Sequence, residues 1–123
     1  MAISKKSARE IEFMRRAGQI VAEVLEILMV RVEPGLTTRD LDRIAEREIR
    51  GRGGIPSFKG YRGFPASLCV SINNEIVHGI PGKRVIKEGD LVSLDLGAIY
   101  QGFHGDSAVT VGAGTITPEH QRL

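Results

Sequence analysis

Two stretches in the first half of the chain place apolar residues three and four positions apart, the spacing of one helix face. The first begins at a capping-box pattern, Ser7 to Glu10, and ends before Pro34. The second begins at Thr37 or Thr38 and ends among the glycines of 51–54. The residues expected on the buried faces are Ile11, Met14, Ile20, Val21, Val24, Leu25, Leu28 and Val32 in the first helix, and Leu41, Ile44, Ala45 and Ile49 in the second.

The second half of the chain carries a pattern typical of antiparallel strands. Leu91 to Tyr100 is mostly apolar, and apolar, partly β-branched residues resume from Phe103 to Val111. Gln101-Gly102 between them suits a two-residue hairpin turn. Amphipathic helices need a surface to cover, so the pattern predicts an α+β fold with two helices packed on an antiparallel sheet.

This hairpin places two carboxylates where strands usually avoid them. With a two-residue loop, Tyr100 faces Phe103 and Asp95 faces Ala108, so Asp106 shares a face with Asp95. Two like charges on one face repel each other, and a divalent cation bound by carboxylate oxygens would relieve the repulsion. The alternative is that one or both aspartates are solvated, or paired with a Lys or Arg.

The loop from 55 to 67 contains two prolines and two glycines, yet it carries Phe58, Tyr61 and Phe64. These aromatic residues could form a small hydrophobic cluster of their own. They could equally form the wall of an apolar pocket.

A second hairpin is expected from Leu68–Ile72 and Glu75–His78, around Asn73-Asn74. His78 then lies where a strand gives way to the loop that begins at Gly79. A histidine in this position is either a structural, hydrogen-bonded residue or a group that acts in catalysis or orients a ligand.

Composition narrows the class of protein. The chain has 123 residues, enough for a single domain, with 41% hydrophobic and 26% charged residues. Its net charge of +2 argues for neither nucleic acid nor membrane as a partner. A lone cysteine, Cys69, and an N-terminus without a signal-peptide pattern indicate an intracellular, cytoplasmic protein. Residues 115–123 offer the start of a further helix, as if the chain were cut from something longer.

Three long segments match a known family in the family's order. They are REIEFMRRAGQIVAEVL near the start, GYRGFPASLCVSINNEIVHGIPG at 60–82 and EGDLVSLDLGAIYQGFHGDSAVTVG at 88–112. Together they closely resemble bacterial type I methionine aminopeptidases, which have the pita-bread fold. The resemblance covers essentially the whole chain.

The resemblance implies a role for each matching residue. Asp95 and Asp106 would ligate a pair of divalent ions, which could be Mn, Fe, Co or Zn. His78 would contact the substrate and assist the reaction, which is hydrolysis of the peptide bond after an N-terminal methionine. The pocket for the methionine side chain would include Phe58, Tyr61, Phe64 and Cys69.

The resemblance also implies an incomplete site. The family's catalytic domain is about twice as long, and its second half supplies a histidine and two glutamates as the remaining ligands. We therefore expect residues 1–123 to form a single domain, the N-terminal half of a pita-bread fold, with 115–123 as a tail toward a second half. Activity would need that second half, or a second copy of the chain in a homodimer. The alternatives are an inactive half-domain and a non-catalytic binding protein.

Overall fold

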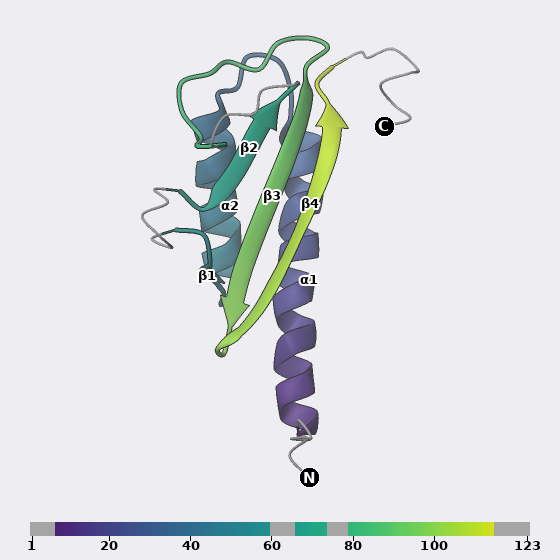
Figure 1. Ribbon diagram of the computed structural model, residues 1–123, viewed down its shortest axis with the longest axis vertical. Coiled ribbons are helices and arrows are strands. Elements are labelled where there is room, and N and C mark those ends of the chain that lie inside the picture. The colour runs from purple at the N-terminus through teal and green to yellow at the C-terminus, as the bar shows by residue number, and fades with distance from the viewer. Residues whose placement is uncertain (1–6, 60–65, 74–78, 115–123) are drawn as a thin grey trace.

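Two helices cover one face of a four-stranded antiparallel sheet (Figure 1). This computed structural model describes residues 7–59, 66–73 and 79–114. The arrangement confirms the expected α+β class. The elements are α1 (Ala8–Arg31), α2 (Thr38–Gly51), β1 (Ile55–Pro56), β2 (Leu68–Ile72), β3 (Leu91–Tyr100) and β4 (Phe103–Gly112).

The long strand β3 is the centre of the sheet. On one side it pairs with β4 along its whole length, from Leu91 opposite Gly112 to Tyr100 opposite Phe103. On its other side β2 pairs with the stretch 92–96, and β1 pairs with Ala98 and Ile99. The predicted hairpin and its register are therefore confirmed.

Side-chain hydrogen bonds fix where both helices begin. Ser7 and Glu10 form the expected capping box of α1. In α2 the N-cap is Thr37, and its partner in a second capping box is Asp40. The neighbouring Thr38 is the first helical residue, and its hydroxyl accepts a hydrogen bond from the Gly82 amide at 2.8 Å.

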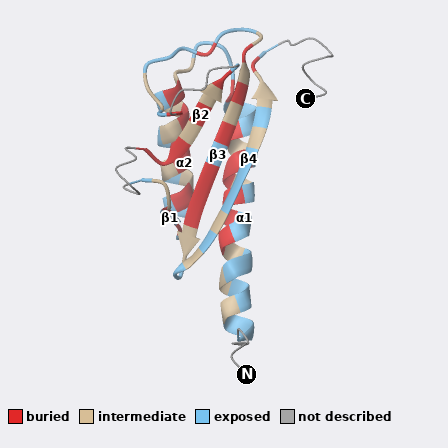
Figure 2. Cartoon of the chain, viewed as in Figure 1, coloured by how far each residue is buried: buried red, intermediate tan, exposed pale blue. Residues whose placement is uncertain are grey.

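The core lies between the helices and one face of the sheet (Figure 2). Alternate residues of β2 and β3 point into it, because successive side chains of a strand point to opposite faces. The buried strand residues are Leu68, Val70, Ile72, Val92, Leu94, Leu96 and Ala98. The opposite face of the sheet is more polar, and both helices lie behind it in the view of Figure 1.

Two expectations for the first helix are wrong. Ile11 and Met14 were expected in the core, but their side chains are 45% and 42% exposed. The start of α1 extends past the end of the sheet near the β3–β4 turn (Figure 1), so no strand lies there to cover it. Phe13, in the same turn of helix, reaches the sheet, where its ring contacts those of Tyr100 and Phe103.

The loops between the helices and strands match the predictions from the sequence only in part. The predicted loop 55–67 contains the short strand β1, which the sequence analysis did not expect. Asn73 has a φ of 56°, as the predicted turn requires. The returning strand predicted at 75–78 lies outside the described residues, as does the tail 115–123. Gly79 accepts a hydrogen bond from the Val70 amide at 2.8 Å, so the chain runs beside β2 again at that point.

One glycine determines how closely α1 approaches the sheet. A Cβ atom at Gly105 of β4 would lie 2.8 to 2.9 Å from backbone atoms of Ala17 and Gly18. Backbone atoms cannot move aside as the end of a side chain can, so any larger residue at position 105 forces helix and strand apart.

We therefore expect Gly105→Ala to lower the free energy of unfolding by about 1–3 kcal/mol, the usual cost of overpacking. Gly51→Ala is the matched control, because a Cβ atom there meets nothing within 4 Å. It should leave stability unchanged or raise it by up to about 1 kcal/mol through helix propensity. Urea unfolding followed by circular dichroism measures both. Equal effects of the two substitutions would contradict the close approach.

Candidate metal site

The β3–β4 hairpin brings Asp95 and Asp106 onto the open face of the sheet. Asp95 lies opposite Ala108, and Asp106 lies opposite Gly97. The two aspartates are thus diagonal neighbours on adjacent strands, within reach of each other's charge. The register depends on the turn, where Gln101 and Gly102 have φ values of 50° and 84°. This pair of positive values gives the right-handed twist that a two-residue hairpin needs.

The electrostatics of Asp95 reflect this placement. Partial burial of its carboxylate between the neighbouring strands raises the pKa of Asp95, and the charge of Asp106 raises it further. A hydrogen bond from the backbone of Leu96 acts in the opposite direction. The carboxylate is still exposed on its outer side, so solvent screens part of the repulsion.

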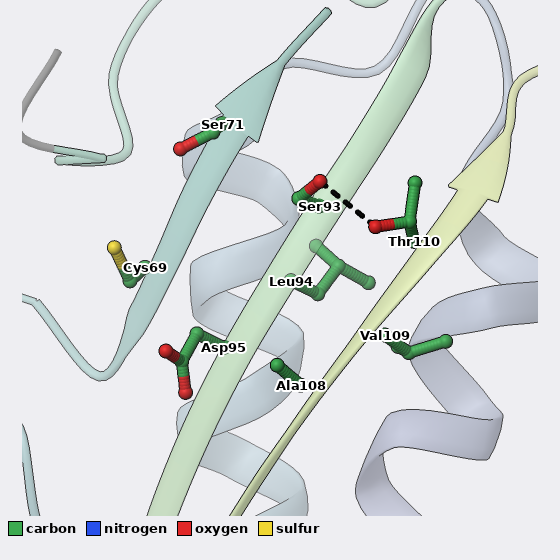
Figure 3. A pocket seen from close by; sticks show the side chains of 8 residues that line it. All are labelled: Cys69, Ser71, Ser93, Leu94, Asp95, Ala108, Val109 and Thr110. Atoms are coloured by element: carbon green, nitrogen blue, oxygen red, sulfur yellow. Dashed lines mark hydrogen bonds between the residues drawn. The ribbon is translucent and has the colours of Figure 1, made fainter. Parts of the chain in front are cut away.

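Cys69 is the neighbour of Asp95 on the other side. It lies directly opposite Asp95 in the β2–β3 pairing, and both side chains point from the same face (Figure 3). Burial and the charge of Asp95 raise the pKa of the Cys69 thiol, which keeps it in the neutral form. Gly79 packs so closely on the Cys69 sulfur that a side chain at 79 would overlap it.

A row of hydroxyl groups continues this face beyond the carboxylate. Ser71, Ser93 and Thr110 lie side by side on three strands, and the hydroxyls of Ser93 and Thr110 are 3.0 Å apart (Figure 3). With Cys69 and Asp95 they line a pocket of 510 Å³. These hydroxyls were not predicted from the sequence, although they follow the same two-residue alternation as the aspartates.

Phe58 closes the face at the level of Asp106. Its ring packs on Gly97, where an added Cβ atom would lie 2.9 Å from the ring, and the Ser57 amide donates to the Gly97 carbonyl at 3.2 Å. Gly97 is opposite Asp106, so an apolar ring and a carboxylate flank the same backbone position. Phe58 and Cys69 are thus on the face that carries the aspartates. Tyr61, Phe64 and His78, the other predicted site residues, lie outside the described residues.

Asp95 and Asp106 supply some, but not all, of the ligands that a divalent cation needs. Two carboxylates that repel each other are the hard oxygen ligands that such cations prefer. Residues 7–59, 66–73 and 79–114 contain no group of three or more potential ligands from His, Cys, Asp and Glu. Metal ions of this kind take four to six or more ligands, so these two aspartates would hold only part of a coordination shell.

The fold is an α+β unit of two helices on an antiparallel sheet, with paired carboxylates on the open face. Residues 12–123 match the metallopeptidase family M24. The chain belongs to this family.

The similar proteins within this family are methionine aminopeptidases. Methionine aminopeptidase 1 of Bacillus subtilis is 53% identical over 118 residues, which cover 96% of this chain and 48% of that protein. The methionine aminopeptidase of Aquifex aeolicus is 55% identical over 130 residues, 100% of this chain and 50% of that one. The resemblance to the N-terminal half of a type I methionine aminopeptidase is thereby confirmed. The chain spans about half the length of the curated relatives it matches.

Solved structures of related proteins have the same fold as this chain. The methionine aminopeptidase of Thermotoga maritima superimposes with a TM-score of 0.90 and 42% identity, over 98% of this chain and 49% of that one. The prolidase of Pyrococcus furiosus, at 20% identity and a TM-score of 0.76, shares the fold. The expected half of a pita-bread fold is thus confirmed. In the part of the chain that the structure describes, none of the helices is long and apolar enough to cross a membrane.

The raised pKa of Asp95 predicts a pH-dependent effect on stability. Because the folded state raises this pKa above its ordinary 3.8, folding disfavours the ionised form. The destabilisation from the ionised carboxylate is absent when the pH is below 3.8. It grows as the pH rises from there to the folded-state pKa of Asp95, and it is complete above the folded-state pKa.

Asp95→Asn should therefore raise the free energy of unfolding of the metal-free protein at neutral pH by at most about 1 kcal/mol, since solvent screens the repulsion. The gain should disappear at about pH 3, where the carboxyl is protonated in both states. Urea titrations at the two pH values measure it, with Ser93→Ala as the control on the same face. A stabilisation that is the same at both pH values would contradict this origin.

Proposed function

We propose that this chain takes part in the metal-dependent removal of N-terminal methionine from peptides and nascent proteins, with Asp95 and Asp106 as metal ligands. One observation carries the proposal: two carboxylates lie as neighbours on one face of a sheet, in a chain that belongs to a metallopeptidase family. The relatives at 45–55% identity are methionine aminopeptidases, which supports the substrate class.

The site would hold a pair of divalent ions, which could be Mn, Fe, Co or Zn. All of these ions accept carboxylate ligands. When bound, the ions would act as Lewis acids that stabilise negative charge developing on the peptide carbonyl oxygen. The chain's own carboxylates would bind and orient the ions. Below the raised pKa of Asp95 protons compete for that ligand, so metal binding should weaken in acid.

The other predicted site residues would contact the substrate. Phe58 and the neutral thiol of Cys69 would form part of an apolar pocket for the methionine side chain, together with Tyr61 and Phe64. The closeness of Phe58 to Gly97, and of Cys69 to Asp95, supports a pocket next to the metal ligands. His78 would contact the substrate and assist the reaction, a role that rests on the family resemblance.

Two aspartates cannot complete the coordination shell, so further ligands must come from outside the described residues. A second half, as in the longer relatives, or a second copy of this chain would supply them. We expect the chain to have no efficient peptidase activity until one of these is present. We also place the protein in the cytoplasm, because nascent chains are its substrates and Cys69 has no second cysteine with which to form an internal disulfide.

Metal binding is the first test. Titration of Mn²⁺ into the metal-free protein in a calorimeter should show binding that Asp95→Asn and Asp106→Asn each weaken by at least about tenfold, since even loss of a group that only orients a metal ligand costs about that much. Glu33→Gln, an exposed carboxylate in the turn after α1, is the control and should bind as the wild type does. Binding that survives both aspartate substitutions would contradict the proposed site.

The reaction is tested in a chimera. This chain, fused to the remaining half of the Bacillus subtilis relative, should release methionine from Met-Ala-Ser when Mn²⁺ is present. Asp106→Asn in the chimera should reduce the rate by at least about 100-fold, because the ions would lose a ligand that positions them. Glu33→Gln should leave the rate unchanged. A folded, metal-loaded chimera that releases no methionine would overturn the proposed reaction.

A further inference from the structure

Four arginines form a row along the outer flank of α2. Arg39, Arg43 and Arg47 follow one another at intervals of four residues, and Arg50 comes three residues later. At 3.6 residues per turn this spacing places all four on one flank, in a row about 16 Å long. All four are exposed, whereas the opposite flank of α2 is buried in the core. We call these four residues the α2 arginine row.

Three carboxylates of α2 border the row and already have partners. On one side, Asp42 and Glu46 accept hydrogen bonds from the amide and the hydroxyl of Ser67, at 2.8 and 3.0 Å. On the other side, Glu48 pairs with Arg52 at 2.7 Å. These border carboxylates connect α2 to the residue before β2 and to the end of the helix, so their shortest contacts are to groups outside the row.

The two arginines at the C-terminal end of the row have only loose partners within it. The Arg47 guanidinium lies 3.5 Å from Glu48, and its side chain is 67% exposed. The Arg50 guanidinium lies 3.3 Å from Glu46, and its side chain is 52% exposed. Such exposed pairs are weak because water screens them, so an incoming anion can replace them.

The two arginines at the N-terminal end, Arg39 and Arg43, form no ion pair within residues 7–59, 66–73 and 79–114. Asp40 lies beside them in sequence, but it belongs to the capping box with Thr37. Hydrogen bonds from Thr37 lower the pKa of Asp40, and the charges of Arg43 and Arg39 lower it further. Arg39 also lies in the first turn of α2, where the helix dipole disfavours a cation. The fold therefore gains little from these two positive charges.

A lysine extends the row at each end. Lys59 pairs with Glu46 at 2.6 Å, and with the last three arginines and two of the border carboxylates it lines a pocket of 400 Å³. Lys83 is exposed at the other end, next to Gly82, whose carbonyl accepts a hydrogen bond from the Arg39 amide at 3.0 Å. The surface thus presents a continuous line of cations, although the net charge of the chain is only +2.

We propose that the α2 arginine row binds a linear polyphosphate chain. Guanidinium groups bind phosphate oxygens through paired hydrogen bonds, and they stay charged at any cellular pH. A regular row of cations is complementary to a chain in which every unit carries negative charge. Both helices lie on the face of the sheet opposite Asp95 and Asp106 (Figure 1), so this site is separate from the candidate metal site and does not depend on it.

The width of the row favours this chain over a nucleic acid. Border carboxylates on both sides leave the row one arginine wide. The two phosphate strands of a duplex are separated by grooves about 6–12 Å wide, so a second strand would meet the border carboxylates. Single strands bind in large part through stacking of their bases on aromatic side chains, and α2 has none. A phosphate chain without bases needs only the cations.

Binding is measured by the fluorescence anisotropy of an end-labelled polyphosphate chain. Arg39→Gln and Arg43→Gln should each raise the dissociation constant by about tenfold or more, because a hydrogen bond between charged groups is worth at least that factor. Each should also reduce the slope of log Kd against log salt by about one, as the loss of one phosphate contact does. Arg31→Gln removes the same charge from the last turn of α1 and should change neither quantity.

A charge-compensated variant separates the row from the net charge of the chain. Arg43→Gln combined with Glu26→Gln keeps the wild-type net charge of +2, because Glu26 is an exposed carboxylate of α1. This variant should bind polyphosphate as weakly as Arg43→Gln alone. Recovery of the wild-type affinity would mean that net charge alone attracts the chain, and it would overturn the proposal.

Competition identifies the chemistry of the ligand. Unlabelled polyphosphate should displace the labelled chain at lower concentrations than RNA with the same number of phosphates, single- or double-stranded, and than polyglutamate with the same number of charges. A stronger RNA competitor would make nucleic acid the ligand, and stronger polyglutamate an acidic protein. Either result would overturn the proposal, as would a wild-type Kd above about 1 mM at physiological salt or equal effects of Arg43→Gln and Arg31→Gln.

Discussion

Repulsion between two carboxylates on one face of the β3–β4 hairpin is the constraint on which the rest of the structure depends. The long, uninterrupted pairing of β3 and β4 fixes Asp95 and Asp106 as neighbours, and the Gln101-Gly102 turn fixes the register. A shift of one residue would send one aspartate into the core. The fold thus keeps together two groups that would separate if they were free. Burial is the larger cause of the raised pKa of Asp95, and the charge of Asp106 adds to it. Carboxylates with such perturbed pKa values cluster at functional sites.

The one-sided packing of the sheet makes room for that site. Both helices bury their apolar faces against the same side, so the opposite side is left for polar groups. Small residues on the open side admit close neighbours: Phe58 packs on Gly97, and the backbone at Gly79 packs on Cys69. The result is a carboxylate pair bordered by a thiol, a row of hydroxyls and an aromatic ring. Sites for small ligands commonly combine apolar and aromatic side chains with a few placed polar groups.

Local patterns predicted those parts of the fold that depend on neighbours in sequence. The capping box of α1, the two-residue turn and the shared face of the two aspartates follow from spacing alone, and all agree with the structure. The exposure of Ile11 and Met14 could not be predicted in this way, because it depends on how far the sheet extends beneath α1. The Ser71 hydroxyl was missed for a related reason, because only the pairing of β2 with β3, which are distant in sequence, brings it beside Ser93. Thr110, in contrast, follows from the register of the predicted β3–β4 hairpin.

The central claim is that Asp95 and Asp106 together bind divalent metal ions. Its most direct test is the position of bound Mn²⁺, measured from the paramagnetic broadening of backbone amide signals in nuclear magnetic resonance spectra. The account predicts that substoichiometric Mn²⁺ broadens the amides around Asp95, Asp106, Cys69 and Gly97 first. Asp42 and Glu46 on α2, which also lie near each other, should be unaffected, because these groups already accept hydrogen bonds from Ser67 and Leu68. Broadening confined to that pair, or spread evenly over exposed carboxylates, would contradict the account.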